Sequence, residues 1–159
     1  MAENSLSLLT DLVGALTKAG IRTWLFGGWA EELFGVRPPG PHRDIDLLYP
    51  AEDFRPLDKF LRARGDVEEV RAKRFSHKRA FQWQGVLVEV LLVRREGAGL
   101  VTSFFDAYQF LWPPDALSGI VRLPSGECGA ASPAALRLYR ERHREVEQAH
   151  QGHAVRSCD

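Results

Sequence analysis

The segment that most limits how this chain can fold is residues 86–93, with the sequence VLVEVLLV. Both faces of such a strand are apolar, a pattern typical of a strand in the interior of a sheet. The Gln84-Gly85 pair in front of it predicts the turn of a hairpin with the alternating segment that ends at Trp83. A hairpin inside a larger sheet is therefore the first element of the expected fold.

The other segments predict an α/β fold in which helices and strands alternate. A helix capped by Asn4 or Ser5 is expected to run to about Lys18 and to end at Gly20. Strands are expected at residues 21–26 and 44–49, and further helices at residues 29–34, 52–64, 104–112 and 132–150. We expect a short mixed sheet of about five strands, with helices packed mainly on one face.

Length and composition indicate one domain. The 159 residues are 45% hydrophobic and 26% charged, an ordinary balance for a globular protein with a core. We assign residues 1–150 to this domain and expect residues 151–159 to form a disordered tail. The N-terminus lacks the basic head of a signal peptide and no apolar run is long enough to span a bilayer, which predicts a cytoplasmic protein with no membrane partner.

Charge and cysteine content disfavour several classes of function. Lys+Arg and Asp+Glu both number 21, and this zero net charge argues against a protein whose whole surface grips nucleic acid. Cys128 and Cys158 are far apart and no C-x-x-C pair occurs, so neither a disulfide framework nor a zinc motif is expected. Four residues near the C-terminus are close to helical spacing and could bind zinc: His143, Glu147, His150 and His153. We favour the interpretation that they belong to a polar tail.

Gly27-Gly28 stand at the expected turn from a strand into a helix. Glycines at this position let the backbone approach a ligand and point amide N–H groups toward it, which suits a phosphate. The alternative is that the pair serves only the conformation of the turn, as glycines often do.

Asp44 and Asp46 flank Ile45 in the second expected strand. Alternate side chains of a strand share a face, so the two carboxylates start roughly 7 Å apart on one side of the sheet. They repel each other and resist burial, and a divalent cation removes both problems. Oxygen ligands of this kind suit magnesium. The alternative is an edge strand whose two acids are solvated.

Glu89 is the only polar residue among residues 86–93. An unpaired carboxylate in an interior strand is costly, so an arginine, a shared proton or a metal ion has to compensate it. A buried salt bridge to one of the many arginines is the alternative to a functional role.

Together these residues resemble a known family. GGWAEELFG followed by RPPGPHRDIDLL is similar to the nucleotidyltransferase superfamily, with its DNA polymerase beta-like fold, in which a glycine pair precedes an acid-x-acid strand. The likeness is greatest to the small aminoglycoside and lincosamide nucleotidyltransferases, which have GGW-type turns and an H-[RD]-D-I-D strand. It is specific for residues 26–48 and extends to Glu89 and to the Ser132-Pro133 helix start. Elsewhere only the order of the elements matches.

The resemblance implies a role for each matching residue. Catalysis and the binding of two Mg²⁺ ions would rest on three carboxylates: Asp44, Asp46 and Glu89. Glu89 would also accept a proton from the acceptor, although many members have the shorter aspartate there. The triphosphate would be bound by Gly27, Gly28 and Arg140. Arg43, which adjoins the acid pair, either reaches a phosphate or only balances charge.

Two further segments bear on the substrates. The basic run at residues 71–79 is interpreted as a solvated hairpin face, with steering of a triphosphate or contact with RNA as alternatives. The aromatic residues between 104 and 112 are assigned mainly to the core, and they can also form a wall for an acceptor. The long C-terminal helical domain of larger relatives is missing, so the acceptor pocket has to come from residues 94–150 or from a partner subunit.

We therefore expect an enzyme that moves a nucleoside monophosphate from a nucleoside triphosphate, ATP among the candidates, to a hydroxyl of a small acceptor, with an antibiotic as one candidate. One alternative is a toxin-like transferase that modifies RNA or protein. Another is a non-catalytic, antitoxin-like binding module, against which the three intact acids argue. A homodimer is compatible with the small size, but no residue pattern requires it.

Overall fold

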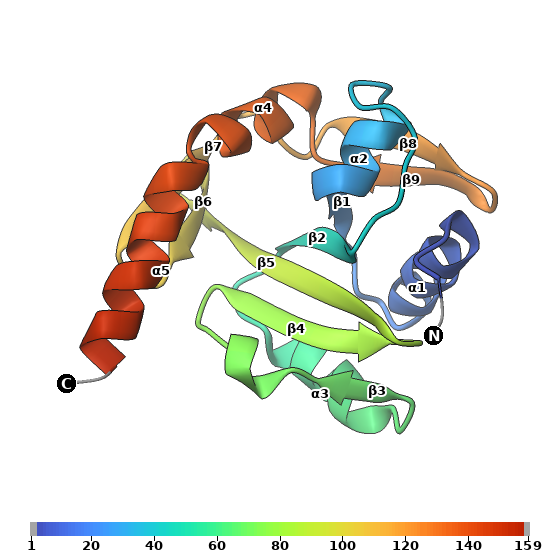
Figure 1. Cartoon of the computed structure of the whole chain (residues 1–159), viewed down its shortest axis with the longest axis horizontal. Helices are drawn as coiled ribbons and strands as arrows, with labels where there is room; N and C mark the ends of the chain where they lie inside the picture. Colours follow the sequence, from blue (N-terminus) through green and yellow to red (C-terminus); the bar gives the residue numbers. More distant parts are fainter. Residues whose placement is uncertain (1–2, 158–159) are drawn as a thin grey trace.

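A mixed β-sheet forms the centre of the structure, a computed structural model that describes residues 3–157 (Figure 1). Its strands are β1 (Trp24–Phe26), β2 (Asp44–Pro50), β3 (Val67–Glu69), β4 (Lys78–Trp83), β5 (Val86–Glu96), β6 (Gly99–Phe104), β7 (Tyr108–Trp112), β8 (Gly119–Leu123) and β9 (Gly126–Ala130). The helices are α1 (Leu6–Lys18), α2 (Gly27–Leu33), α3 (Arg55–Ala63), α4 (Pro133–Glu141) and α5 (His143–Ser157), with a 3₁₀ turn η1 (Arg71–Lys73). This confirms the predicted α/β class.

The order of the strands is β3-β4-β5-β2-β1-β9-β8, and β6 pairs with both β5 and β7. The chain therefore has a nine-stranded sheet where about five strands were expected. β5 lies at the centre, antiparallel to β4 and parallel to β2. Trp83 faces Val86 across the tight Gln84-Gly85 turn, which confirms the predicted hairpin.

The additional strands come mainly from residues 99–130. The sequence pattern of this segment did not predict its secondary structure. The helix expected at residues 104–112 is wrong, because this segment contains the turn between β6 and β7. Phe105 and Asp106 occupy the left-handed region with φ of 56° and 54° and reverse the chain. In β7, Phe110 and Trp112 are buried while Leu111 is exposed, which is the two-residue period of a strand.

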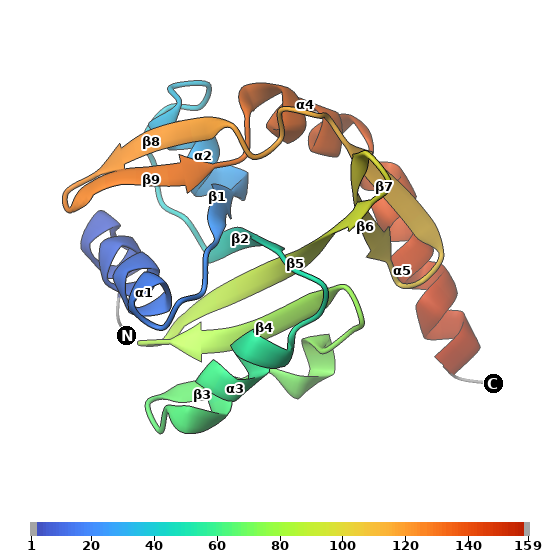
Figure 2. The same ribbon diagram turned by 180° about the vertical axis from the view of Figure 1, so that it is seen from behind.

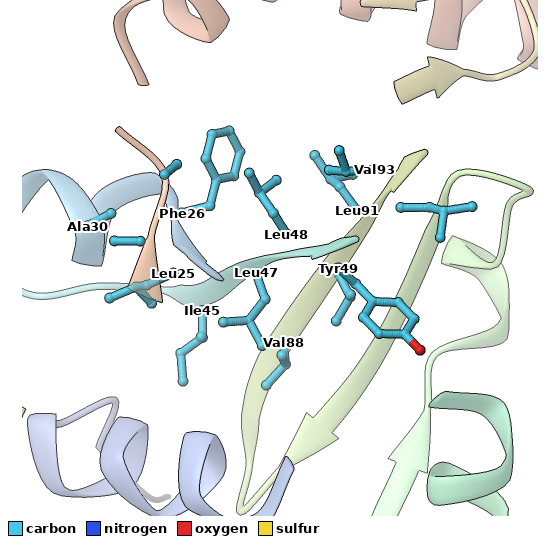
Figure 3. Close-up of a cluster of buried hydrophobic side chains, with 14 of the residues drawn as sticks. Leu25, Phe26, Ala30, Ile45, Leu47, Leu48, Tyr49, Val88, Leu91 and Val93 are labelled. Atoms are coloured by element: carbon cyan, nitrogen blue, oxygen red, sulfur yellow. The ribbon is translucent and has the colours of Figure 1, made fainter. Parts of the chain in front are cut away.

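The two faces of the central strands have different coverings. Figure 3 shows Ile45, Leu47 and Val88 pointing to the side of α1, whereas Leu48 and Leu91 point the opposite way. α1 and α3 cover the first face (Figure 2). α1 is capped as predicted, since the Ser5 hydroxyl accepts from the Leu8 amide at 3.1 Å, and it buries Leu8, Leu9, Leu12 and Leu16.

The second face is partly covered by the C-terminal helices and the β6–β7 hairpin (Figure 1). The Ser132 hydroxyl caps α4 by accepting from the Ala135 amide at 3.1 Å, as the Ser-Pro start predicted. The single helix expected at residues 132–150 is divided, because α4 ends at Glu141 and α5 begins at His143. Residues 151–157, expected in the tail, continue α5 as helix, and residues 158–159 lie outside the described residues.

None of the helices within residues 3–157 combines the length and the apolar character needed to cross a membrane.

Candidate active site

The glycine turn and the acid strand are in direct contact. Gly27 begins α2 immediately after β1, in the left-handed region with φ of 67°. A Cβ atom added to Gly27 would lie 2.4 Å from Oδ2 of Asp46. Glycine is therefore required here both by the backbone conformation and by the closeness of the carboxylate. The first amide groups of α2 also have no helical partners, which leaves them available to a ligand.

The three predicted carboxylates lie on the same face of two neighbouring strands. Asp44 and Asp46 alternate with the buried Ile45 on β2. In the parallel pairing of β2 with β5, Glu89 is the Cα partner of Asp46. Adjacent strands are separated by about 4.8 Å, so the pairing brings the third acid beside the second. Ile45, Leu47 and Val88, which alternate with these acids, point to the side of α1 (Figure 3), so the carboxylates lie on the opposite face.

Asn4 fixes the start of the acid strand. Its Nδ2 donates to the carbonyl oxygens of His42 and Asp44 at 3.1 and 3.0 Å, and its Oδ1 accepts from Trp29 Nε1 at 3.0 Å. The His42 ring also packs on Trp29, with the two ring centroids 4.2 Å apart. Asn4 thus joins α2, the loop before β2 and β2 itself. Nothing in the local sequence indicated this role. Of the two residues considered for the cap of α1, Ser5 is the cap and Asn4 is not.

The aspartate pair has unusual electrostatics. Burial raises the pKa of Asp46 to about 8, and the charges of Asp44 and Glu89 add to the rise. Burial and the charge of Glu89 also raise the pKa of Asp44. The surroundings therefore disfavour the charged form of both carboxylates. A divalent cation held by the pair would reverse this effect.

Glu89 is compensated by lysines and not by an arginine. Lys78 of β4 and Lys73 of η1 both form ion pairs with its carboxylate, the latter at 3.1 Å. Burial acts to raise the pKa of Glu89, but the hydrogen bonds and charges of Lys78 and Lys73 outweigh it, and the net pKa is lowered. Glu89 therefore stays ionised at the side of the aspartate pair.

The donor chemistry fits magnesium, although the three acids do not enclose a ready-made site. Across residues 3–157, no three His, Cys, Asp or Glu side chains are arranged to hold a metal ion. Asp44 and Asp46 could supply the one or two carboxylates that magnesium usually takes from a protein. Glu89 can join them by exchanging its lysine contacts. Two members of the disfavoured zinc group contact each other, with Nε2 of His143 3.1 Å from Oε1 of Glu147.

The predicted arginines occupy different environments. The guanidinium of Arg140 on α4 forms a two-point ion pair with the carboxylate of Glu31 on α2, with Nη2 2.5 Å from Oε1. The Arg140 side chain remains 62% exposed, whereas that of Glu31 is 11% exposed. Arg43 is exposed beside Asp44, where its charge partly offsets the effect of burial on the Asp44 pKa.

Two adjoining cavities meet at Asp46. The first, of about 300 Å³, is lined by residues around the glycine turn and α4: Phe26, Gly27, Gly28, Glu31, Asp46, Leu136, Tyr139, Arg140 and His143. The second, of about 620 Å³, includes Glu89 and both lysines and is walled by the β6–β7 turn and α5. Asp46 and Tyr139 belong to both cavities. Burial, together with the charges of Asp46 and Glu89, raises the Tyr139 pKa to about 12.

Five of the predicted site residues line the two cavities: Gly27, Gly28, Asp46, Glu89 and Arg140. Asp44 lies beside Asp46 on β2, and Arg43 is exposed next to Asp44. The functions of these residues stay predictions. Sequence reasoning missed four neighbours of this group: Glu31, Lys73, Lys78 and Tyr139. The hairpin register contained a signal for one of them, because a two-residue turn at 84–85 places Lys78 on the same face as Glu89.

The metal-free protein is expected to lose stability as the pH rises from about 4 to about 8. The Asp46 pKa is raised on folding, so the folded state holds a proton that the unfolded state releases. The resulting stabilisation is fully present below the unfolded pKa and is lost as the pH passes through about 8. Asp46→Asn should remove this dependence and increase the free energy of unfolding at about pH 8 by about 1–3 kcal/mol.

Urea denaturation of both proteins at several pH values measures this effect. Asp11→Asn, an exposed change on α1, serves as the control and should follow the wild type. If Asp46→Asn destabilises the protein at high pH as much as at low pH, the Asp46 carboxylate is not held in its neutral form by the fold.

The chain is similar to several known proteins. The sequence profile of the aminoglycoside-2''-adenylyltransferase family matches residues 8–102. The lincomycin-bound crystal structure of LnuA, a lincosamide antibiotic adenylyltransferase, has a TM-score of 0.71 at 12% identity, over 93% of this chain and 98% of that one. ANT(2'')-Ia in complex with adenylyl-2''-tobramycin has a TM-score of 0.62 at 16% identity, over 91% of this chain and 86% of that one. No curated protein sequence matches.

The fold and the acid strand behind its glycine turn thus define a nucleotidyltransferase, which confirms the class that the sequence resemblance indicated. Within that superfamily, the chain belongs to the aminoglycoside-2''-adenylyltransferase family, whose profile covers more than half of its residues.

Proposed function

We propose that this protein transfers a nucleoside monophosphate from a nucleoside triphosphate to a hydroxyl of a small, antibiotic-like acceptor, with Mg²⁺ held by Asp44 and Asp46. The observation that supports this most strongly is the position of Asp46 in the wall shared by two cavities. The smaller cavity has the glycine turn and Arg140, which suit a triphosphate. The larger has Glu89, which suits the attacking hydroxyl.

Each protein group has a separate task in this proposal. The free amides at the start of α2 bind phosphate oxygens, and Gly27 lets the triphosphate approach Asp46. Arg140 uses one edge of its guanidinium for Glu31, which orients it, and keeps further N–H groups for a phosphate. Glu89, which is ionised, accepts the proton of the acceptor hydroxyl. Asp44 and Asp46 would hold Mg²⁺, which when bound would supply positive charge to offset that of the triphosphate and of the pyrophosphate leaving group.

The size of the larger cavity favours a small acceptor over a macromolecule. Its volume of about 620 Å³ falls within the range of about 300–1,000 Å³ that is typical of small-molecule sites. A toxin-like transferase acting on RNA or protein would instead require an open surface beside Glu89. In this chain, residues of α5 and of the β6–β7 turn wall the cavity that contains Glu89.

The proposal is tested by two measurements on the full chain. Calorimetry with Mg²⁺ and each of the four ribonucleoside triphosphates should detect binding of at least one and thereby identify the base. Mass spectrometry should then detect addition of that nucleoside monophosphate to an acceptor, with lincomycin and tobramycin as the first compounds, because they appear in the two structural neighbours. Absence of any magnesium-dependent triphosphate binding would contradict the proposal and favour the non-catalytic module.

Arg140→Ala is expected to weaken magnesium-dependent triphosphate binding by about tenfold or more, since it removes charge-assisted hydrogen bonds to phosphate. Calorimetric Kd values measure this change. Arg137→Ala, an exposed arginine on the same helix that does not line the smaller cavity, is the matched control and should bind within about twofold of the wild type. Equal Kd values for the two variants would remove Arg140 from the triphosphate site.

A further inference from the structure

The larger cavity contains very few carboxylates for a positively charged ligand. Among the described residues, three acidic ones line it, and two of them, Asp46 and Glu89, belong to the catalytic group. The third is Glu147 on α5, whose side chain is 62% exposed and already contacts His143. With Asp46 engaged by its cation and Glu89 by the acceptor hydroxyl, the described residues of the wall offer no further buried carboxylate to an acceptor.

The same cavity contains two fixed positive charges next to the reacting group. The side chain of Lys78 is 19% exposed and that of Lys73 is 42% exposed, and both ammonium groups pair with Glu89. Because Glu89 would contact the acceptor hydroxyl in the proposed reaction, the two ammonium groups that pair with it lie close to an acceptor bound there. Like charges at such short range repel strongly in a partly desolvated site.

Much of the remaining wall is aromatic and apolar. Rings from the basic segment, the β6–β7 turn and α4 form most of it: Phe75, Phe104, Phe105 and Tyr139. Phe105 also stacks on the ring of His150 from α5, with centroids 4.7 Å apart and planes inclined by 3°. Such walls bind the flat or apolar body of a ligand, and an aromatic face accommodates a single ammonium but does not neutralise several.

His77 adds a hydrogen-bond donor to this wall. It is 4% exposed, and its Nδ1 accepts from the Phe105 amide at 3.2 Å. Burial, with the charge of Lys78, lowers the His77 pKa to about 4, so the ring is neutral. When one nitrogen of a neutral imidazole accepts, the other carries the hydrogen. His77 therefore suits a hydroxyl or ether oxygen and opposes an ammonium.

We propose that the acceptor is a hydroxyl compound with an apolar or aromatic body and at most one positive charge, and that Lys73 and Lys78 exclude polycationic acceptors. This inference rests on the proposed function, and it narrows the acceptor class beyond the name of the family. Aminoglycosides carry several ammonium groups, each of which requires an anionic or strongly polar partner when it is desolvated. Apart from the catalytic acids, the one carboxylate among the described residues that line the cavity is that of Glu147.

Direct binding distinguishes the acceptor classes. The full chain is first saturated with Mg²⁺ and α,β-methylene-ATP, or the corresponding analogue of whichever nucleotide the calorimetric screen identifies. It is then titrated with tobramycin, a polycation, with lincomycin, which has one amine, and with 4-nitrophenyl β-D-glucopyranoside, which is neutral and aromatic. At least one of the last two should bind at least about tenfold more tightly than tobramycin.

A variant tests the role of the lysines. Lys73→Gln should strengthen tobramycin binding by about threefold or more, because it removes one repelling charge from the cavity. Lys59→Gln, an exposed lysine on α3 outside the cavity, should leave it unchanged. Tobramycin binding that is as tight as or tighter than that of both other probes would overturn the inference, and so would failure of all three to bind. Failure of the proposed function is seen separately, as absence of binding by the nucleotide analogue in the first step.

Discussion

Asp46→Asn is expected to reduce the rate of nucleotidyl transfer by about 10³-fold or more. The Asp46 carboxylate lies in the wall shared by the two cavities, beside Gly27 and opposite Glu89 in the strand register. Asparagine keeps the size of the side chain but has no negative charge with which to hold a divalent cation. A steady-state assay with saturating triphosphate and acceptor measures the rate.

Stability separates this loss of activity from unfolding. Because the fold holds the Asp46 carboxylate with a raised pKa, the asparagine variant should be at least as stable as the wild type near neutral pH when no metal is bound. An inactive protein with an unchanged or increased melting temperature is therefore the expected result. Asp11→Asn should retain the wild-type rate. A rate for Asp46→Asn within about tenfold of the wild type would exclude Asp46 from the chemistry.

Gly27→Ala is expected to damage both the fold and the site. The new Cβ would lie 2.4 Å from Asp46 Oδ2, and alanine disfavours the φ of 67° at this position. Left-handed strain and steric overlap together should decrease the free energy of unfolding by about 2–4 kcal/mol. For a chain of this length, that decrease corresponds to a fall in Tm of about 5–15 °C.

The activity of the same variant should fall further than its stability explains. Asp46 has to move away from the added methyl group, and the first turn of α2 has to shift with it, so triphosphate binding should weaken in the fraction that remains folded. Gly14→Ala is the matched control. Gly14 lies inside α1 with no heavy atom within 4 Å of an added Cβ, so alanine should increase stability by up to about 1 kcal/mol. Equal melting temperatures for the two variants would contradict the strain at Gly27.

Local pattern predicted most elements that surround the site. The apolar run at residues 86–93 and the two-residue turn before it gave the central hairpin, and the Ser5 and Ser132 caps marked two helix starts. The β6–β7 hairpin was predicted as a helix. Its turn uses Phe105 and Asp106 in the left-handed region, where neither residue type is a strong signal. Such a turn is stabilised by packing of the strands and not by the preference of its residues.

The compensation of Glu89 shows a different limit of sequence reasoning. The sequence required some partner for this acid, and an arginine was the alternative considered. The partners are Lys78 and Lys73, because β4 lies next to β5 and η1 folds back over it. The contact of Lys73 depends on how the chain runs between β3 and β4. No repeating pattern in the local sequence encodes that path.

By itself, the sequence determined the features that depend on near neighbours in the chain. The two-residue period of a strand placed Asp44 and Asp46 on one face, and the glycine pair marked the turn beside them. Tertiary structure alone decided that β5 pairs in parallel with β2, so that Glu89 faces Asp46, and that α4 returns Arg140 to the glycine turn. Pairing over such distances is selected by burial of the whole core, to which residues throughout the chain contribute, and so it cannot be read from any one segment.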